Sequence, residues 1–156
     1  MKPGLRIVSG GQTGVDRGAL DAALDLGASC GGWCPAGRRA EDGPIDSRYP
    51  LSETKTSDYL ERTHLNVIES DATLIVYFNK LEGGTKKTRT FCELQHKPFL
   101  LLDMATLNKT QALAMLRTFI QESKVSSLNV AGPRASKQKH GHSVTRSLIS
   151  ALLKND

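Results

Sequence analysis

A glycine-rich segment near the start of the chain has the residue types that bind anions. Ser9-Gly10-Gly11-Gln12-Thr13-Gly14 lies between a short apolar run and a segment with helical spacing. Glycines leave backbone N–H groups accessible, and a helix N-terminus adds about half a positive charge, so the arrangement suits a phosphate. The alternative is a tight turn that needs no ligand. The candidate phosphate-binding residues in this segment are Gly10, Gly11, Gln12, Thr13, Gly14 and Arg17.

Two further segments repeat this chemistry. Gly83-Gly84-Thr85-Lys86-Lys87-Thr88 offers amides and hydroxyls at a helix start, and its candidate residues are Gly83, Gly84, Thr85 and Thr88. The alternative is a surface helix that begins with solvated lysines. In Gly132-Pro133-Arg134-Ala135-Ser136, Arg134 could form a forked contact with a phosphate or carboxylate, and Ser136 could donate beside it. The alternative there is a rigid turn with a solvated arginine.

None of these segments is a common nucleotide motif. Ser9 stands where the dinucleotide fingerprint has its first glycine, and no Gly-Lys-Ser/Thr follows as in a Walker A loop. His140 and His142 have no third metal ligand nearby in the sequence, and neither Cys34 nor Cys92 shows a paired base. We therefore expect no catalytic and no metal-binding residues.

Residues 35–56 form a long segment rich in Gly, Pro, Asp, Arg and Ser without periodicity. Ordered loops of this length in compact domains are usually functional. Its charged residues could form an ion-pair network that orders the loop, or they could contact a ligand; they are Arg38, Arg39, Glu41 and Asp42. The tryptophan just before it, Trp33, could stack on a heterocycle or fill the core, and core packing is the more frequent role.

Strand and helix patterns alternate along the whole chain. Apolar runs predict strands at 5–9, 28–34, 72–78, 99–102 and 128–131. Helical spacing predicts helices at 15–26, 58–69, 83–96, 108–122 and 144–153. Strands joined by helical crossovers pair in parallel, which predicts one α/β domain over residues 1–156, a Rossmann-like, doubly wound three-layer sandwich with about five strands. In such sheets ligands bind outside the carboxyl ends of the strands, where all three glycine segments then meet.

Composition limits the class of protein. The chain has 156 residues, of which 38% are hydrophobic and 24% charged, as in an ordinary globular domain. The first apolar residues turn to glycine at once, which is not the pattern of a signal peptide, and no apolar run is long enough to span a membrane, so we expect a cytoplasmic protein with no membrane partner. Its net charge of +5 favours anionic ligands, and its 5% aromatic content argues against nucleic acid. Three cysteines are expected to be reduced.

Residues 7–103 and 128–136 resemble the family named putative molybdenum carrier proteins, which are similar to the algal molybdenum-cofactor carrier. The resemblance covers about two-thirds of the chain, and its matching stretches are SGGQTGVDRGALDAAL (9–24), GGWCPAGRRAEDGPI (31–45), RYPLSET (48–54), RTHLNVIESDATLIV (62–76), GGTKKT (83–88) and NVAGPRAS (129–136). It implies a Rossmann-like fold, a homo-oligomer that is a tetramer, and a pocket at the strand carboxyl ends. It also implies that the pocket holds the molybdenum cofactor (molybdopterin), whose single phosphate suits a glycine loop.

More remotely, the chain resembles the superfamily of Lonely Guy-type phosphoribohydrolases, which cleave the N-glycosidic bond of nucleoside monophosphates. These enzymes carry a Pro-Gly-Gly-x-Gly-Thr motif with a glutamate three residues on. Gly83-Gly84-Thr85 keeps part of this motif, but Thr88 stands where the glutamate is expected, and Glu93 comes eight residues after Thr85. This departure counts against hydrolase chemistry.

The leading hypothesis is therefore a carrier that binds a small phosphorylated ligand, the molybdenum cofactor being the one that the resemblance implies. The residues alone do not separate a pterin from a nucleotide. A second hypothesis is a nucleoside-monophosphate N-glycosidase, for which the candidate acids are Asp16, Glu41, Asp42 and Glu93. A third is a sensor of a nucleotide-like signal.

Overall fold

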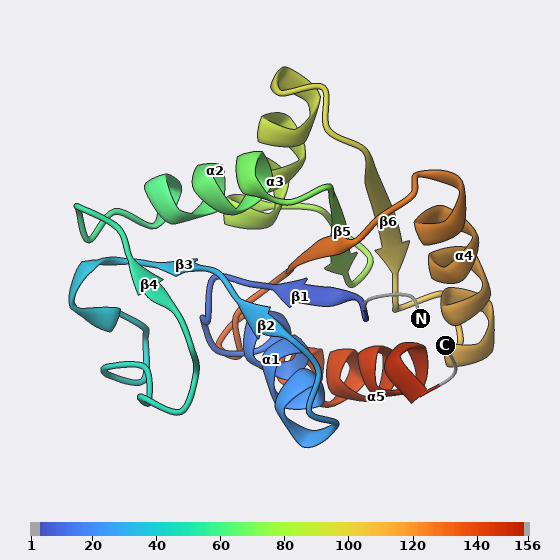
Figure 1. Ribbon diagram of the computed structural model, residues 1–156, viewed down its shortest axis with the longest axis horizontal. Helices are drawn as coiled ribbons and strands as arrows, with labels where there is room; N and C mark the ends of the chain where they lie inside the picture. The colour runs from blue at the N-terminus through green and yellow to red at the C-terminus, as the bar shows by residue number, and fades with distance from the viewer. Residues whose placement is uncertain (1–3, 155–156) are drawn as a thin grey trace.

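The computed structural model describes residues 4–154 and contains a parallel α/β sandwich (Figure 1). Its main strands are β1 (Arg6–Val8), β2 (Cys30–Gly31), β5 (Ala72–Tyr77), β6 (Phe99–Asp103) and β7 (Ser127–Ala131). Its α-helices are α1 (Val15–Asp25), α2 (Tyr59–Glu69), α3 (Gly83–Leu94), α4 (Lys109–Glu122) and α5 (Gly141–Lys154). Two short strands, β3 (Trp33–Cys34) and β4 (Ser52–Glu53), and the 3-10 turn η1 (Ala36–Arg38) lie outside the main sheet.

All pairs in the main sheet are parallel, and the strand order is β2-β1-β7-β5-β6. The last strand of the chain therefore lies in the centre, with Leu128 opposite Ile7 on one side and Val130 opposite Leu74 on the other. If β7 is counted as the first strand, the order becomes 3-2-1-4-5, the usual order of a doubly wound sheet. The β7–α5 unit at the end of the chain thus takes the place that the first unit has in other doubly wound proteins.

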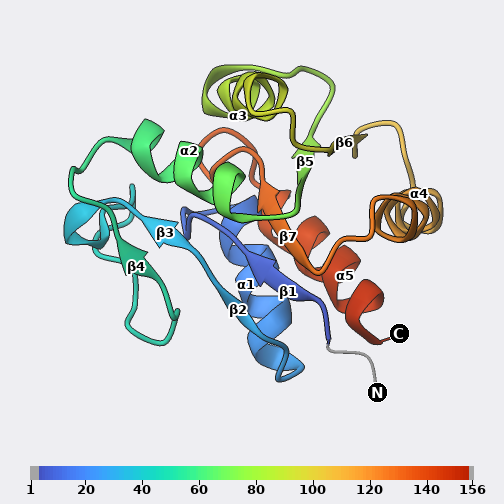
Figure 2. The ribbon, with the colours of Figure 1, turned by 45° about the horizontal axis from the view of Figure 1, so that its top comes forward.

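The helices form two layers around this sheet. Figures 1 and 2 show α1, α4 and α5 on one face and α2 and α3 on the other. Fully buried aliphatic side chains fill the interior between sheet and helices, among them Ile7, Leu74, Leu128, Leu148 and Ile149. The predicted Rossmann-like three-layer fold is confirmed. Within residues 4–154, no helix is both long and apolar enough to cross a bilayer.

Side chains at the helix starts fix where two of the helices begin. Asp58 accepts a hydrogen bond from the backbone N–H of Leu60 at the start of α2. Asn108 and Gln111 form a reciprocal capping box at the start of α4. Such caps satisfy amides that a helix leaves without partners. The start of α2 matters for function, because α2 carries residues to the carboxyl edge of the sheet.

The structure corrects the predicted strand 28–34, which divides into β2 and β3 at Gly32. Gly32 has a φ of +136°, and a Cβ there would lie 2.2 Å from the carbonyl oxygen of Ser9. The glycine lets the chain turn away from the main sheet, so that β3 pairs in parallel with β4. The 35–56 segment thus contains a short strand that its sequence did not predict. Helix α5 also begins at Gly141, three residues before its predicted start.

Candidate functional site

The carboxyl edge of the sheet brings together the three glycine segments. The connection after β7 leads to α5 on one face, and the connection after β5 leads to α3 on the opposite face. The gap between these strands is the topological switch point, where doubly wound proteins bind ligands. The first and third segments touch directly, because Val15 N–H donates to Pro133 O at 3.2 Å and Ala135 N–H donates to Thr13 Oγ1 at 3.0 Å.

A small cavity opens at this edge on the α2–α3 side. Its volume is about 10 Å³, which is room for one water molecule. It is lined by Gly10, Arg62, Thr63, Asn66, Thr88, Asn129, Val130 and Ala131. We call it the Arg62 cavity. Of the predicted site residues, Gly10 and Thr88 line it, while the α2 and β7 residues were not predicted as site residues.

Arg62 supplies the positive charge of this cavity. Its Nη1 lies 3.3 Å from Asp16 Oδ2, and only 17% of its side chain is exposed. Its Nε is buried and makes no hydrogen bond to a described residue. The guanidinium occupies the space beside Gly10, where a Cβ would lie 2.3 Å from Nη1. Glycine at position 10 is therefore required for this arginine to reach the cavity.

Asp16, the partner of Arg62, lies beneath the cavity. Only 3% of its side chain is exposed, and its Oδ2 also accepts the backbone N–H of Gln12 at 3.3 Å. Burial raises the pKa of Asp16 from 3.8 to about 6, against the opposing effect of the Arg62 charge. Asp16 is too deeply buried to reach a ligand, and it acts by holding Arg62.

The start of α3 is open. The backbone N–H groups of Gly84 and Thr85 make no hydrogen bond within residues 4–154, whereas Lys86 N–H bonds to Glu82 O. A Cβ built on Gly84 would meet nothing within 4 Å. One turn further along, the Thr88 hydroxyl donates to Gly84 O at 3.0 Å. The second glycine segment therefore presents free amides near the Arg62 cavity, an arrangement that favours anions.

In the first glycine segment the chain itself satisfies part of the donors. Gly11 N–H donates to Ser9 Oγ at 3.1 Å, and the Gln12 side-chain amide donates to Arg39 O at 3.0 Å. Arg17 donates to Gly11 O and makes a forked contact with Asp42 at 2.5 and 2.9 Å. Gly14 packs against the Pro133 carbonyl, where a Cβ would lie at 2.5 Å. The segment lies beneath the 35–56 segment, and within residues 4–154 the backbone N–H groups of Gly10, Thr13 and Gly14 still make no hydrogen bond.

The third segment also binds a group of the chain. The carboxylate of Glu41 accepts hydrogen bonds from the Thr13 hydroxyl, from Ser136 N–H at 3.1 Å and from Ser136 Oγ at 2.6 Å. Arg134 Nε lies 3.7 Å from the same carboxylate. Hydrogen bonds from Ser136 and Thr13 lower the pKa of Glu41 below its ordinary value. Thr13, Arg134 and Ser136 thus converge on one anion, and that anion is the Glu41 carboxylate.

An arginine inside the 35–56 segment orders it. Arg38 donates to four backbone carbonyls of its own segment, those of Ile45, Asp46, Tyr49 and Leu51. Arg39 bonds to Ser57 O and lies 4.5 Å from the ring centre of Tyr59. Of the two roles left open for the charged residues, ordering of the loop is the one that these contacts serve.

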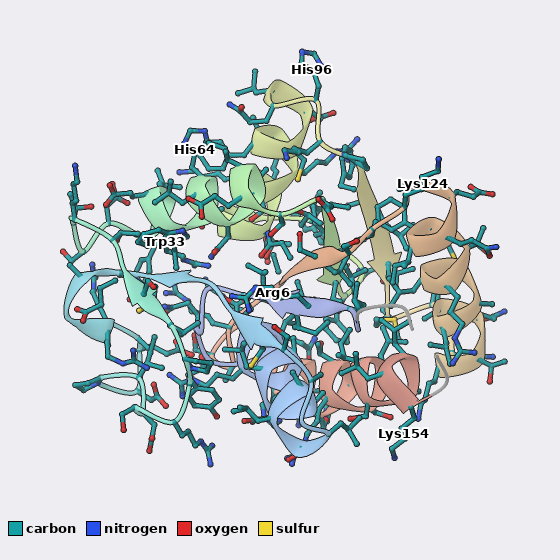
Figure 3. The ribbon with its side chains drawn as sticks, in the orientation of Figure 1. Arg6, Trp33, His64, His96, Lys124 and Lys154 are labelled. Atoms are coloured by element: carbon teal, nitrogen blue, oxygen red, sulfur yellow. The ribbon has the colours of Figure 1, made fainter. Side chains whose placement is uncertain are left out.

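A second hollow, of about 170 Å³, lies on the same face of the sheet. It is lined by Arg6, Val8, Gly32, Trp33, Ser52, Asn66 and Glu69. Figure 3 shows Arg6 and Trp33 on the side of the sheet toward α2. Trp33 is half-buried, and the Asn66 side chain brackets its backbone, accepting from Trp33 N–H at 2.8 Å and donating to Trp33 O at 3.0 Å. Asn66 lines both hollows and separates them.

The candidate acids of the glycosidase hypothesis lie outside the Arg62 cavity. Glu41 and Asp42 are paired with Ser136 and Arg17 as described above, and Glu93 is exposed beside Arg89 at 3.9 Å. None of the four acids is among the residues lining the cavity. Within residues 4–154 no three His, Cys, Asp or Glu side chains gather as metal ligands. His142 instead bonds to Asp21 at 2.6 Å.

Comparisons with known proteins agree with the fold. The chain is similar to a crystal structure described as a putative molybdenum carrier protein from Syntrophus aciditrophicus SB, with 40% sequence identity, a TM-score of 0.94 and 98% of each chain covered. No curated protein matches significantly. Residues 7–153 match the circularly permutated YpsA SLOG family. A circular permutation accounts for the central position of β7, because the unit that comes first in other doubly wound chains comes last here. The chain belongs to this family.

Proposed function

We propose that this protein is a carrier that binds a small phosphorylated heterocycle at the carboxyl edge of its sheet. The observation that carries the proposal is the convergence of Arg62, Thr88 and the open start of α3 at the topological switch point. The cavity itself has room only for a water molecule, so a phosphate would bind at its mouth, with a charge-assisted bond from Arg62 and hydrogen bonds from the free amides of Gly84 and Thr85. The other predicted residues, in the first and third glycine segments, frame the same edge.

The molybdenum cofactor is the ligand we propose within this class. It is suggested by the similar protein from Syntrophus aciditrophicus, which is described as a putative molybdenum carrier. The pterin dithiolene would hold the metal, so the protein would need to bind only the pterin and its phosphate. We further propose a cytoplasmic homo-oligomer, a tetramer, as the resemblance to the carrier family implies.

The residues that line the Arg62 cavity favour ligand binding by a carrier over hydrolysis by an enzyme. Cleavage of an N-glycosidic bond is assisted by a carboxyl group near the reacting carbon. The residues that line the Arg62 cavity are neutral apart from Arg62, and Thr88 stands where the phosphoribohydrolase motif has its glutamate. These residues can bind and orient a phosphate ester without attacking it.

Equilibrium binding tests this proposal. The protein is titrated with molybdopterin, with AMP and GMP, and with inorganic phosphate, and binding is followed by calorimetry. Arg62→Gln should weaken binding of the phosphorylated ligand about tenfold or more, since it removes a charge-assisted contact. Arg89→Gln is the matched control, because Arg89 is an exposed arginine of α3 that does not line the cavity.

Removal of Arg62 leaves the buried Asp16 without its partner, so Asp16→Asn/Arg62→Gln is measured as well. If the double variant folds and binds as weakly as Arg62→Gln, lost binding comes from Arg62 and not from unfolding. If both variants bind all these ligands as the unmodified chain does, the Arg62 cavity is not the phosphate site and the proposal is wrong.

A further inference from the structure

The Glu41 carboxylate is held as a bound anion would be. Oε1 accepts from the Thr13 hydroxyl and from Ser136 N–H, and Oε2 accepts from Ser136 Oγ at 2.6 Å. The guanidinium of Arg134 lies beside Oε2 at 3.7 Å. These donors come from the starts of α1 and of the β7–α5 connection, and we call them the Ser136 subsite (Thr13, Arg134 and Ser136). Two hydroxyls, one amide and one guanidinium are the donor set that binds a phosphate or a carboxylate.

The subsite is prepared independently of Glu41. Ala135 N–H donates to Thr13 Oγ1 at 3.0 Å, which leaves the Thr13 hydroxyl proton free to point at the anion. The third segment is further held by Lys137 N–H and Gln138 N–H, which both bond to Arg134 O. The donors would therefore keep their positions if Glu41 left.

The segment that carries Glu41 is attached to the body mainly by side chains. Residues 40–44 make one backbone hydrogen bond among themselves, from Gly43 N–H to Ala40 O. The Ala40 side chain packs against a small apolar cluster that includes Tyr49, the Glu41 carboxylate is bound in the Ser136 subsite, and the Asp42 carboxylate is bound to Arg17. Loss of one carboxylate contact would leave the segment held by the other, so Glu41 can leave without unfolding the domain.

We propose that the Ser136 subsite is a second anion-binding site for the phosphate or a carboxylate of an incoming ligand, and that Glu41 occupies it until the ligand displaces it. This inference rests on the proposed function, because the subsite lies at the same edge of the sheet as the Arg62 cavity. An external anion and the Glu41 carboxylate exclude each other, since both need the same donors and repel at contact distance. Displacement would release residues 40–44 from the third segment, since Glu41 makes the contacts that join the two.

The test compares variants that differ in the two carboxylates. Binding of inorganic phosphate is measured by calorimetry for the unmodified chain, Glu41→Gln and Asp42→Asn. Glu41→Gln keeps the shape of the side chain but removes the competing charge, and phosphate affinity should rise about tenfold or more because the subsite becomes competent in a larger fraction of molecules. Asp42→Asn loosens the same segment but leaves Glu41 in the subsite. The phosphate affinity of this variant should stay within about twofold of that of the unmodified chain.

Two further measurements connect this effect to the donors. Adding either Ser136→Ala or Arg134→Gln to the Glu41→Gln variant should remove its gain in phosphate affinity. In the unmodified chain, saturating phosphate should speed hydrogen exchange at residues 40–44. Thermal unfolding of each variant by circular dichroism establishes that the compared proteins are folded.

The outcomes separate this inference from the proposed function. If Glu41→Gln binds phosphate no better than the unmodified chain, or if its gain survives Ser136→Ala, Glu41 is only a structural tie and the inference is wrong. If Arg62→Gln nevertheless weakens binding of the phosphorylated ligand, the proposed function stands even though the inference about Glu41 fails. If the Glu41→Gln gain appears but Arg62→Gln has no effect, the Ser136 subsite stands and the Arg62 cavity fails.

Discussion

Arg62 Nη1 and Asp16 Oδ2 lie 3.3 Å apart beneath the first glycine segment, although the two residues are 46 positions apart in the chain. The pair joins α2 to the start of α1 and points one guanidinium toward the Arg62 cavity. A buried charge is costly without a partner, and here each charge has one. The pair therefore fixes Arg62 in position at the proposed ligand site, although burial still disfavours the ionised form of Asp16.

Gly10→Ala should displace Arg62, because the new Cβ would lie 2.3 Å from its Nη1. We expect the free energy of unfolding to fall by about 1–3 kcal/mol and ligand binding to weaken. Chemical denaturation and calorimetry measure the two effects. Gly4→Ala is the control, because a Cβ there meets nothing within 4 Å. An unchanged stability and affinity in Gly10→Ala would show that Arg62 does not depend on this glycine.

Asp16→Asn should change how stability depends on pH. The pKa of Asp16 is raised to about 6 in the folded chain, so between 3.8 and 6 the folded state binds more protons than the unfolded state. The contribution of this group to stability is therefore fully present below pH 3.8 and is lost as pH rises through 6. The shift corresponds to at most about 3 kcal/mol.

Denaturation of the unmodified chain and Asp16→Asn between pH 4 and 7 checks this prediction. The unmodified chain should lose stability relative to Asp16→Asn as the pH rises. Carboxylates with lowered pKa values, such as Glu41 and Asp42, act in the opposite direction but are present in both proteins and cancel. A difference that stays constant from pH 4 to 7 would show that Asp16 titrates normally.

Asn66→Ala should loosen β3, because it removes both hydrogen bonds that bracket Trp33. The expected loss of stability is about 1–2 kcal/mol, since the backbone groups left without a partner are only partly buried. Trp33 is the only tryptophan, so its emission reports this site directly and should shift to longer wavelength. Gln121→Ala, on the exposed side of α4, should leave the emission unchanged. Equal emission in Asn66→Ala would contradict the prediction.

A permuted chain should fold to the same sheet. Opening the chain between Ser123 and Lys124 and joining Lys154 to Gly4 through a short glycine-serine linker makes β7 the first strand. The start of β1 and the end of α5 lie near one another in Figures 1 and 2, so a short linker can join them. Circular dichroism should show the same helix content and a cooperative transition. Opening at Ile75, inside the buried strand β5, should instead abolish folding.

Local signals in the sequence were enough to predict the class of fold and the edge of the sheet at which we propose the ligand site. Apolar runs alternating with helical spacing predicted parallel strands, and the glycine segments after them predicted donors at one edge, because these signals are local. The family resemblance was likewise visible in contiguous motifs and is confirmed by the family match over residues 7–153.

Which donors at this edge are free depends on contacts between distant segments, which became visible in the folded chain. The central place of β7, the approach of Arg62 to Asp16, and the binding of Glu41 to Ser136 across 95 positions depend on packing between distant segments. Periodicity and composition describe neighbours along the chain, and they carry no information on which distant side chain will satisfy a given amide. The sequence therefore located the edge of the sheet, and the packing of the 35–56 segment and α2 decided its chemistry.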